Sequence, residues 1–327
     1  MTIRKIFFLY AELILILVLS LLAGYNIFYD NSQDYTIYSG HYNSVSWDNY
    51  LGVEVYFEYL YKLLVAFSVL ILQIDYYMFA SLIAFISLSI KFYLLSKRPY
   101  AIYLKIGYLL TIYPYYECLR TRSRLALAFV YLAIEFRDRK FISLGFVLFG
   151  AFLHYSFMPF VLIWIFYNYL NDIKKTKKLL MFGFFIGIII AILFNYLDVI
   201  LGFLSFVDFR IWAYFVEDKG YLNVWIFPKY FLLGWISYLV LKNKLDSLNT
   251  ILIFIASSFT ILSFSVMKIN ILSLSILDIG LFAYFLVATN QNLTNKSLIR
   301  FLLFTVILMD FTFKILELPV LILHLLK

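Results

Sequence analysis

The chain has 327 residues, of which 64% are hydrophobic, 21% aromatic and only 14% charged. Soluble domains carry about 25% charged residues, so here there are too few polar side chains to cover a water-exposed surface. A mean hydropathy of +0.91 therefore excludes a water-soluble enzyme and a secreted scaffold. The formal charge of +8 comes from scattered clusters without one basic face, which excludes a nucleic-acid-binding protein. We expect the protein to lie in a lipid bilayer.

Long apolar runs follow one another along almost the whole chain. Each is longer than the roughly ten residues of a barrel strand, so the pattern predicts an all-α, polytopic membrane protein. The first run lacks a small-residue cleavage site at its end, which favours a retained helix over a signal peptide. The twelve candidate segments lie near residues 6–28, 55–72, 76–96, 101–118, 122–137, 141–154, 156–170, 179–198, 225–241, 250–266, 271–288 and 299–316.

The distribution of Lys and Arg sets the expected orientation, because cytoplasmic loops retain positive charge. Basic clusters lie at 4–5, 97–105, 137–140, 174–178, 242–244 and 296–300, and we assign them to the cytoplasm. The acidic segments 25–54 and 199–224 become two periplasmic loops.

The alternation of sides fails at one segment, 55–72, whose apolar run contains Glu58 and Lys62. It would have to start and finish outside, so we interpret 55–75 as a re-entrant or interfacial helix. About eleven transmembrane helices remain (10–12), in a single transmembrane domain over 1–327 with the N-terminus inside and the C-terminus outside.

Three arginines, Arg120, Arg122 and Arg124, lie at the predicted outer face between two apolar helices, against the usual charge bias. Guanidinium groups bind phosphate oxygens bidentately, and a helix N-terminus favours anions, so this cluster predicts a site for a lipid-linked phosphate or pyrophosphate. The alternative is that the arginines reach lipid headgroups or pair with Glu117.

His154 lies at the outer end of another apolar run, where an imidazole can accept a proton near neutral pH. It is our first candidate for a catalytic base; the alternative is a hydrogen bond between helices. Two outer charges, Arg210 and Lys268, are weaker candidates for the phosphate site.

The first outer loop combines carboxylates with aromatic side chains, a composition that suits sugars. Asp34 and Glu54 are candidate bases or sugar ligands, and Tyr35 and Tyr38 are candidate stacking residues. An interfacial aromatic belt is the alternative for the tyrosines. Cys118 is the only cysteine and no metal-ligand spacing occurs, so we expect neither a metal nor another cofactor.

These residues resemble a known family. The run T-R-S-R-L-A-L-A over 121–128 resembles the I-R-Q-G-L-A-x-A signature of the EpsG-like and Wzy-type polymerases of bacterial surface polysaccharides (O-antigen, capsule or exopolysaccharide). The run A-F-L-H-Y-S over 151–156 resembles their A-x-x-F-H-x-S element, and Asp34, Tyr35 and Tyr38 match an early D-Y-x-x-Y. Glu54 matches the acidic residue that opens the next helix. The resemblance covers about residues 30–165; Ser123 and Arg124 depart from it by replacing Gln-Gly.

The resemblance implies a metal-independent membrane glycosyltransferase related to the lipid-linked-sugar-using GT-C class. It would lie in the bacterial inner membrane and join undecaprenyl-pyrophosphate-linked oligosaccharide repeat units, donor and acceptor, at the periplasmic face. A chain-length regulator is a further partner that this function admits.

Two other functions use similar chemistry. A flippase or other transporter of lipid-linked oligosaccharides also needs cations, but at the membrane midplane and with repeat symmetry, which this sequence lacks. An O-antigen ligase uses the same donor; the short loop 199–224 favours a polymerase. A membrane acyltransferase and a protein without catalytic activity are the remaining alternatives.

Overall fold

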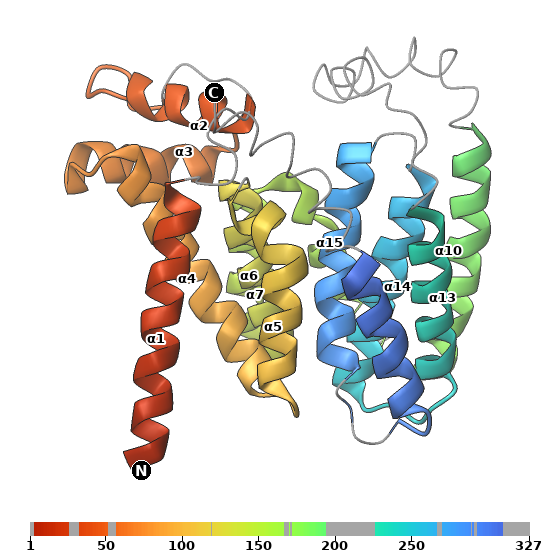
Figure 1. Cartoon of the computed structure of the whole chain (residues 1–327). Helices are drawn as coiled ribbons and strands as arrows, with labels where there is room; N and C mark the ends of the chain where they lie inside the picture. The colour runs from red at the N-terminus through yellow and green to blue at the C-terminus, as the bar shows by residue number, and fades with distance from the viewer. Residues whose placement is uncertain are drawn as a thin grey trace, which may run out of the picture. The chain divides into compact units, whose positions relative to one another are not determined.

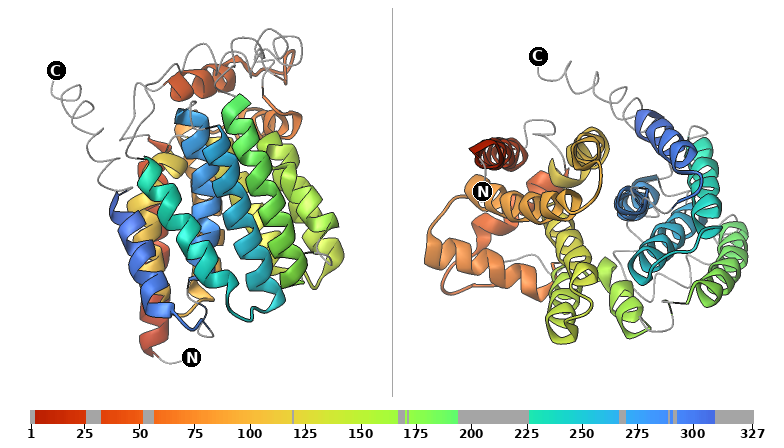
Figure 2. Two further views of the ribbon diagram at one scale, coloured as in Figure 1. Left: turned by 90° about the vertical axis from the view of Figure 1, so that its right-hand side faces the viewer. Right: turned by 90° about the horizontal axis from the view of Figure 1, so that it is seen from below.

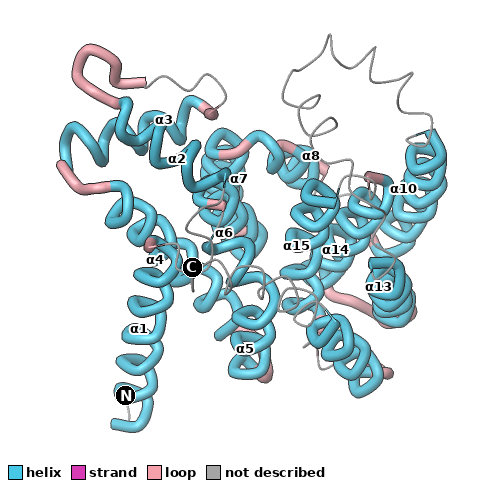
Figure 3. Tube along the Cα trace, turned by 45° about the horizontal axis from the view of Figure 1, so that its top comes forward, coloured by secondary structure: helices cyan, strands magenta, loops and turns pink. Residues whose placement is uncertain are grey.

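The structure is a computed structural model that describes residues 3–25, 33–51, 57–118, 120–166, 170, 172–193, 226–266, 270–288, 290 and 293–309. Within these ranges the chain consists of helices and loops, without strands (Figure 3). The predicted all-α class is therefore confirmed. Two described helices are long and apolar enough to cross a bilayer, α4 (Tyr76–Ser96) and α14 (Ser247–Ser265), and several shorter apolar helices accompany them. The number of transmembrane helices stays a prediction.

The chain divides into two compact units. The first consists of residues 1–97 and 109–165, together with 316–327, which lie outside the described ranges; the second consists of 98–108 and 166–315. The first unit contains α1 (Ile3–Gly24), α2 (Gln33–Ser44), α3 (Tyr59–Ala66) with a π-helical turn η1 (Phe67–Leu72), α4, the end of α5 (Ala101–Ile112) with a second π-helical turn η2 (Tyr113–Glu117), α6 (Thr121–Glu135), α7 (Lys140–Leu153), a 3₁₀ turn η3 (Tyr155–Phe157) and α8 (Pro159–Ile165).

Within the first unit, α4 packs against α1 on one side and α6 on another, and α6 packs against α7. The helices α2 and α3 lie across the direction of α1 and α4 at one end of this unit (Figure 1). The π-helical turn η1 ends before Gln73, whose backbone is left-handed with φ 52°. α4 begins shortly afterwards, where Asp75 caps it by accepting a hydrogen bond from the backbone N–H of Met78 (2.7 Å). The outer segment 25–54, predicted as a loop, contains the helix α2.

The pair α6 and α7 positions the site described below. Only four residues, 136–139, connect the two helices, so they are antiparallel neighbours. Gly150 allows their close approach: a Cβ there would lie 2.7 Å from Cγ1 of Val130 and 3.0 Å from the carbonyl oxygen of Ala126. Ser143 joins them near the other end, where its hydroxyl donates to the carbonyl of Ala133 over 2.8 Å.

The second unit contains the start of α5, then α10 (Ile173–Leu193), α13 (Ile226–Leu241), α14, α15 (Asn270–Val287) and a helix over 296–309. Its helices lie side by side with roughly parallel axes (Figure 2). α14 is the central element, since α10, α13 and α15 all pack against it. Its buried hydroxyls are paired: Ser257 donates to Ser237 over 2.9 Å, and Ser237 shares a 2.6 Å hydrogen bond with Tyr284.

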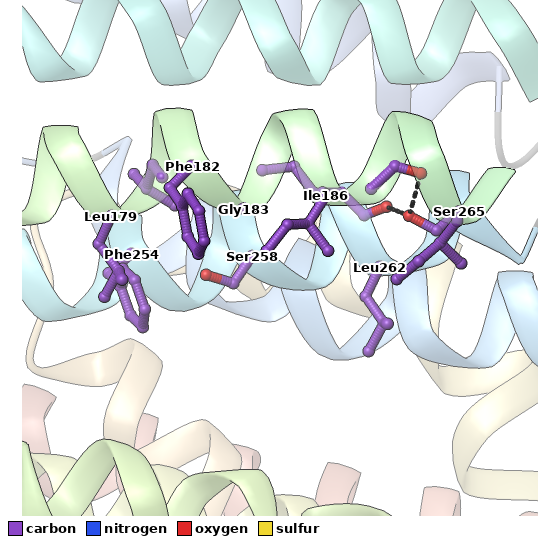
Figure 4. A pocket seen from close by; sticks show the side chains of 12 residues that line it. Leu179, Phe182, Gly183, Ile186, Phe254, Ser258, Leu262 and Ser265 are labelled. Atoms are coloured by element: carbon purple, nitrogen blue, oxygen red, sulfur yellow. Dashed lines mark hydrogen bonds between the residues drawn. The ribbon is translucent and has the colours of Figure 1, made fainter. Parts of the chain in front are cut away.

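An apolar groove of about 310 Å³ lies between α10 and α14. Phe182, Gly183 and Ile186 line it from α10, and Phe254 and Ser258 from α14 (Figure 4). At one end, the hydroxyl of Ser265 donates to the Gly187 carbonyl over 3.1 Å, so the two helices touch there. The lining carries no ionisable side chain, and the groove therefore has no acid–base chemistry of its own.

Candidate functional site

Arg122 occupies the first turn of α6, and its guanidinium is held by side chains from two other elements. Its Nε donates to the hydroxyl of Tyr38 on α2 over 2.9 Å, and its Nη1 forms an ion pair and hydrogen bond with Oε2 of Glu58. The guanidinium carbon also lies 4.6 Å from the ring centroid of Phe57. A guanidinium has five N–H donors, and three of them have no partner among the residues that the structure describes.

Glu58 is the residue immediately before α3, and its carboxylate connects Arg122 to His154. Its second oxygen, Oε1, lies 2.8 Å from Nδ1 of His154 and accepts a hydrogen bond from the backbone N–H of Tyr155 over 3.3 Å. The Glu58 side chain is only 3% exposed. Burial alone would raise the pKa of Glu58, but the hydrogen bond with His154 and the charge of Arg122 outweigh it and lower the pKa to about 2.

His154 follows the last residue of α7, where the backbone leaves the helix in an extended conformation. Because Glu58 is ionised and can only accept, Nδ1 of His154 must carry the proton in this contact. The neutral ring then has its lone pair on Nε2, which has no hydrogen-bond partner among the residues that the structure describes. The side chain is 19% exposed, and in this tautomer Nε2 is the ring atom that can accept a proton.

These contacts bring together three of the predicted residues, Tyr38, Arg122 and His154, although 31 residues separate Arg122 from His154. The antiparallel pair α6 and α7 returns the chain to the same end of the unit. Glu58 joins them from a helix that precedes both. The sequence indicates Glu58 only as a charge within the apolar segment 55–72 and does not assign it to the site. A carboxylate inside an apolar run is the feature from which its role could have been predicted.

Arg124 belongs to a different network inside the first unit. It is 1% exposed, and its two terminal nitrogens donate to the carbonyls of Glu117 and of Ala80, the second over 2.6 Å. The Glu117 carboxylate in turn pairs with the fully buried Lys91 of α4. Arg124 therefore joins α4 to α6 and is buried in their packing, so the prediction that it binds phosphate is not met in this structure. Lys91 lies within the apolar run 76–96 and was not singled out from the sequence.

Arg120 precedes the first residue of α6 and is partly exposed. It lies close enough to His154 to interact with it electrostatically. Of the three clustered arginines, Arg120 and Arg122 thus lie beside the imidazole, whereas Arg124 is buried in the helix packing.

The structure describes the other predicted site residues to different extents. Tyr38 accepts a hydrogen bond from Arg122, and its expected contact with sugar stays a prediction. Asp34 and Tyr35 lie in α2, but their side chains are outside the described part of the structure. Glu54, Arg210 and Lys268 lie outside the described residues altogether.

His41 is a second histidine near the site. It is 1% exposed, neither ring nitrogen has a hydrogen-bond partner in the described ranges, and its ring lies edge-on to Phe57 with centroids 4.7 Å apart. Burial, together with the charges of Lys62 and Arg122, lowers the pKa of His41 to about 4, so it is neutral at physiological pH. His41 therefore packs behind Arg122 without adding charge. No group of three metal-ligating side chains occurs in the described residues.

Comparison with known proteins bears on the whole chain. No curated protein and no solved structure gives a significant match. A family model described as the EpsG family matches residues 11–318. That match covers nearly the full length, including all four elements in which the resemblance was found. The chain belongs to the EpsG family, whose members are helical membrane proteins of polysaccharide biosynthesis.

Proposed function

We propose that this protein is a polymerase-type glycosyltransferase that joins oligosaccharide repeat units carried on undecaprenyl pyrophosphate, at the periplasmic face of the bacterial inner membrane. The observation that carries the proposal is the arrangement of Arg122, Glu58 and His154, with one carboxylate linking a guanidinium to an imidazole. Membership of the EpsG family supports the reaction class.

In the proposed reaction, a hydroxyl of the acceptor sugar attacks the anomeric carbon of the donor's first sugar. The new C–O bond forms as the bond from that carbon to the pyrophosphate oxygen breaks, and the electron pair leaves with the lipid pyrophosphate. The hydroxyl proton passes to Nε2 of His154. Glu58 stabilises the imidazolium that results, because its carboxylate already binds Nδ1.

The pyrophosphate gains negative charge as it leaves, so cations placed in advance lower the barrier. Arg122 offers its three remaining N–H donors and Arg120 adds a second charge. Both residues lie at the N-terminus of α6, where the helix dipole favours an anion. For the residues not described, the proposal keeps Arg210 and Lys268 as further phosphate ligands. Asp34, Tyr35 and Glu54 remain candidates for contacts with sugar.

Gel analysis of surface polysaccharide tests the proposal. A deletion strain should be complemented with wild-type protein, Arg122→Lys, His154→Ala and the matched control Arg139→Lys. Arg139 precedes α7 at the other end of the same helix pair and also lies over an aromatic ring, 5.9 Å from that of Phe136. We expect wild type and the control to restore a ladder, and the two site variants to give a single repeat unit at equal protein abundance.

Two results would contradict the proposal. A normal ladder from both site variants would show that Arg122 and His154 are not needed for polymerisation. Loss of all lipid-linked units from the outer face would indicate a flippase instead.

A further inference from the structure

A second groove lies wholly within the second unit, and its composition differs from that of the groove between α10 and α14. It has a volume of about 340 Å³ and is bounded by the start of α5, the end of α15 and the helix over 296–309. Apolar side chains form most of its wall, namely Leu104, Phe285, Ala288, Leu303, Phe304 and Ile307. Such a surface suits a hydrocarbon chain.

One charged side chain, Arg300, lines this groove. Its Nε and Nη2 are buried, and neither has a hydrogen-bond partner among the described residues. The guanidinium carbon lies 4.2 Å from the ring centroid of Tyr100, which contributes a cation–π contact but no acceptor oxygen. The guanidinium as a whole is only partly buried, but it has two nitrogens without an acceptor in the described ranges and faces an apolar wall, so this arrangement favours an external anion.

The backbone of Tyr100 gives a second, independent indication. Its φ is 63°, in the left-handed region that a bulky residue rarely adopts, and the residue follows Pro99 at the turn before α5. Strained conformations of this kind persist where they hold a ligand-binding group in place. Here the strained backbone keeps the ring, which is 51% exposed, beneath the guanidinium of Arg300.

We infer that this groove binds one anionic glycerophospholipid, with its headgroup phosphate on Arg300 and an acyl chain along the apolar wall. A guanidinium takes a phosphate bidentately, and tyrosine rings are typical of the headgroup level of a bilayer. Lys296 lies one turn earlier on the same face of its helix and is exposed, so it can add charge for a negative headgroup. Both cations belong to a cluster predicted to be cytoplasmic, where basic pockets between helices bind anionic lipids. The inference does not depend on the proposed function.

Native mass spectrometry of the detergent-purified protein tests this site, with dioleoylphosphatidylglycerol as the anionic probe and dioleoylphosphatidylcholine as the zwitterionic one. We expect wild type to bind one phosphatidylglycerol more tightly than phosphatidylcholine. Arg300→Gln should weaken that binding by about tenfold or more, the effect of losing a charge-assisted hydrogen-bonded pair. The control Arg139→Gln, which also removes an arginine that lies over an aromatic ring, should bind like wild type.

A second variant guards against failure of Arg300→Gln to fold. Tyr100→Gly suits the positive φ, so it should purify at least as well as wild type, yet it should also weaken phosphatidylglycerol binding. Equal binding by Arg300→Gln and Arg139→Gln, or equal affinity of wild type for the two lipids, would overturn the inference. Unchanged binding by Tyr100→Gly would overturn it as well.

Discussion

Glu58 contacts two groups of the proposed site at once, and its substitution should separate their roles. Glu58→Gln keeps the size of the side chain but removes the charge that stabilises a protonated His154. We expect the turnover rate of lipid-linked repeat units to fall by about 100-fold, the usual contribution of acid–base catalysis, with little change in KM. Arg122→Lys should instead raise KM for the donor and lower the turnover rate, because the planar fork is lost. Initial rates with purified enzyme would distinguish these patterns.

The combination of two substitutions tests whether His154 and Arg122 serve one transition state. If they do, His154→Ala with Arg122→Ala should cost little more than the worse single change, since each already disables the same step. Multiplicative losses in the rate would show that the two residues act independently. Both single variants need equal abundance in the membrane for this comparison.

The lowered pKa of Glu58 gives a prediction about stability and pH. The ionised form is favoured in the folded protein, so its contribution is fully present above the ordinary pKa of 4.5 and is lost as the pH falls towards about 2. The difference in unfolding temperature between wild type and Glu58→Gln should thus stay constant from about pH 5 to pH 8 and shrink below about pH 4.5. Thermal unfolding in detergent would measure it. A difference that changes most between pH 6 and pH 8 would point to a histidine as the titrating group.

At the scale of elements, the packing of α7 on α6 determines whether His154 reaches Glu58. Gly150→Ala would place a Cβ 2.7 Å from Val130, which forces the helices apart, whereas Gly145 on the same helix has nothing within 4 Å of such a Cβ. We expect Gly150→Ala to lower stability by about 1–3 kcal/mol and to reduce polymer length. Gly145→Ala should leave activity unchanged and add about 0.5–1 kcal/mol of stability. Thermal unfolding and the ladder assay together would show both effects.

Element boundaries were largely predictable from the sequence where apolar runs end at charges. The run 76–96 coincides with α4, and 122–137 and 141–154 differ from α6 and α7 by one or two residues at each end. The run 101–118 was less accurate, because α5 ends at Ile112 and the chain continues as a π-helical turn to Glu117. A change of helix type does not alter hydropathy, so composition could not reveal it.

The site was predictable only in part, for a physical reason. Arg122 and His154 lie on consecutive helices joined by a short turn, and this local geometry brings their ends together. Glu58 is 64 residues from Arg122 and 96 from His154, and its contacts depend on how α3 folds back over the helix pair. Arg124 was assigned to the phosphate site because it is two residues from Arg122. Two residues are about half a helical turn, so its side chain lies on the opposite face of α6 and is buried.

At the scale of the whole molecule, the ion pairs described above lie within the first unit, between Glu58, Arg122 and His154 and between Lys91 and Glu117. In the second unit, buried hydroxyls pair with one another, as Ser237 does with Tyr284 and with Ser257, and the unit also buries Lys229 and Asp278. Charged groups are costly at membrane depth unless they are paired. The paired charges in residues 58–154 therefore agree with a functional site in the first unit.

The orientation of this site depends on whether the segment α3–η1 crosses the membrane, and one labelling experiment decides it. Ser46 and Ser96 are both exposed and flank α3–η1 and α4. If only α4 crosses, the two positions lie on opposite sides of the membrane; if α3–η1 crosses as well, they lie on the same side. Cys118 is buried, so a Cys118→Ala background leaves each introduced cysteine as the single reactive thiol. We expect an impermeant maleimide applied from the periplasm to label Ser46→Cys at once and Ser96→Cys only after permeabilisation. Labelling of both positions from the same side would show that α3–η1 crosses the bilayer. Arg122 and His154, which lie at the same end of α6 and α7, would then both have to be assigned to the opposite side of the membrane.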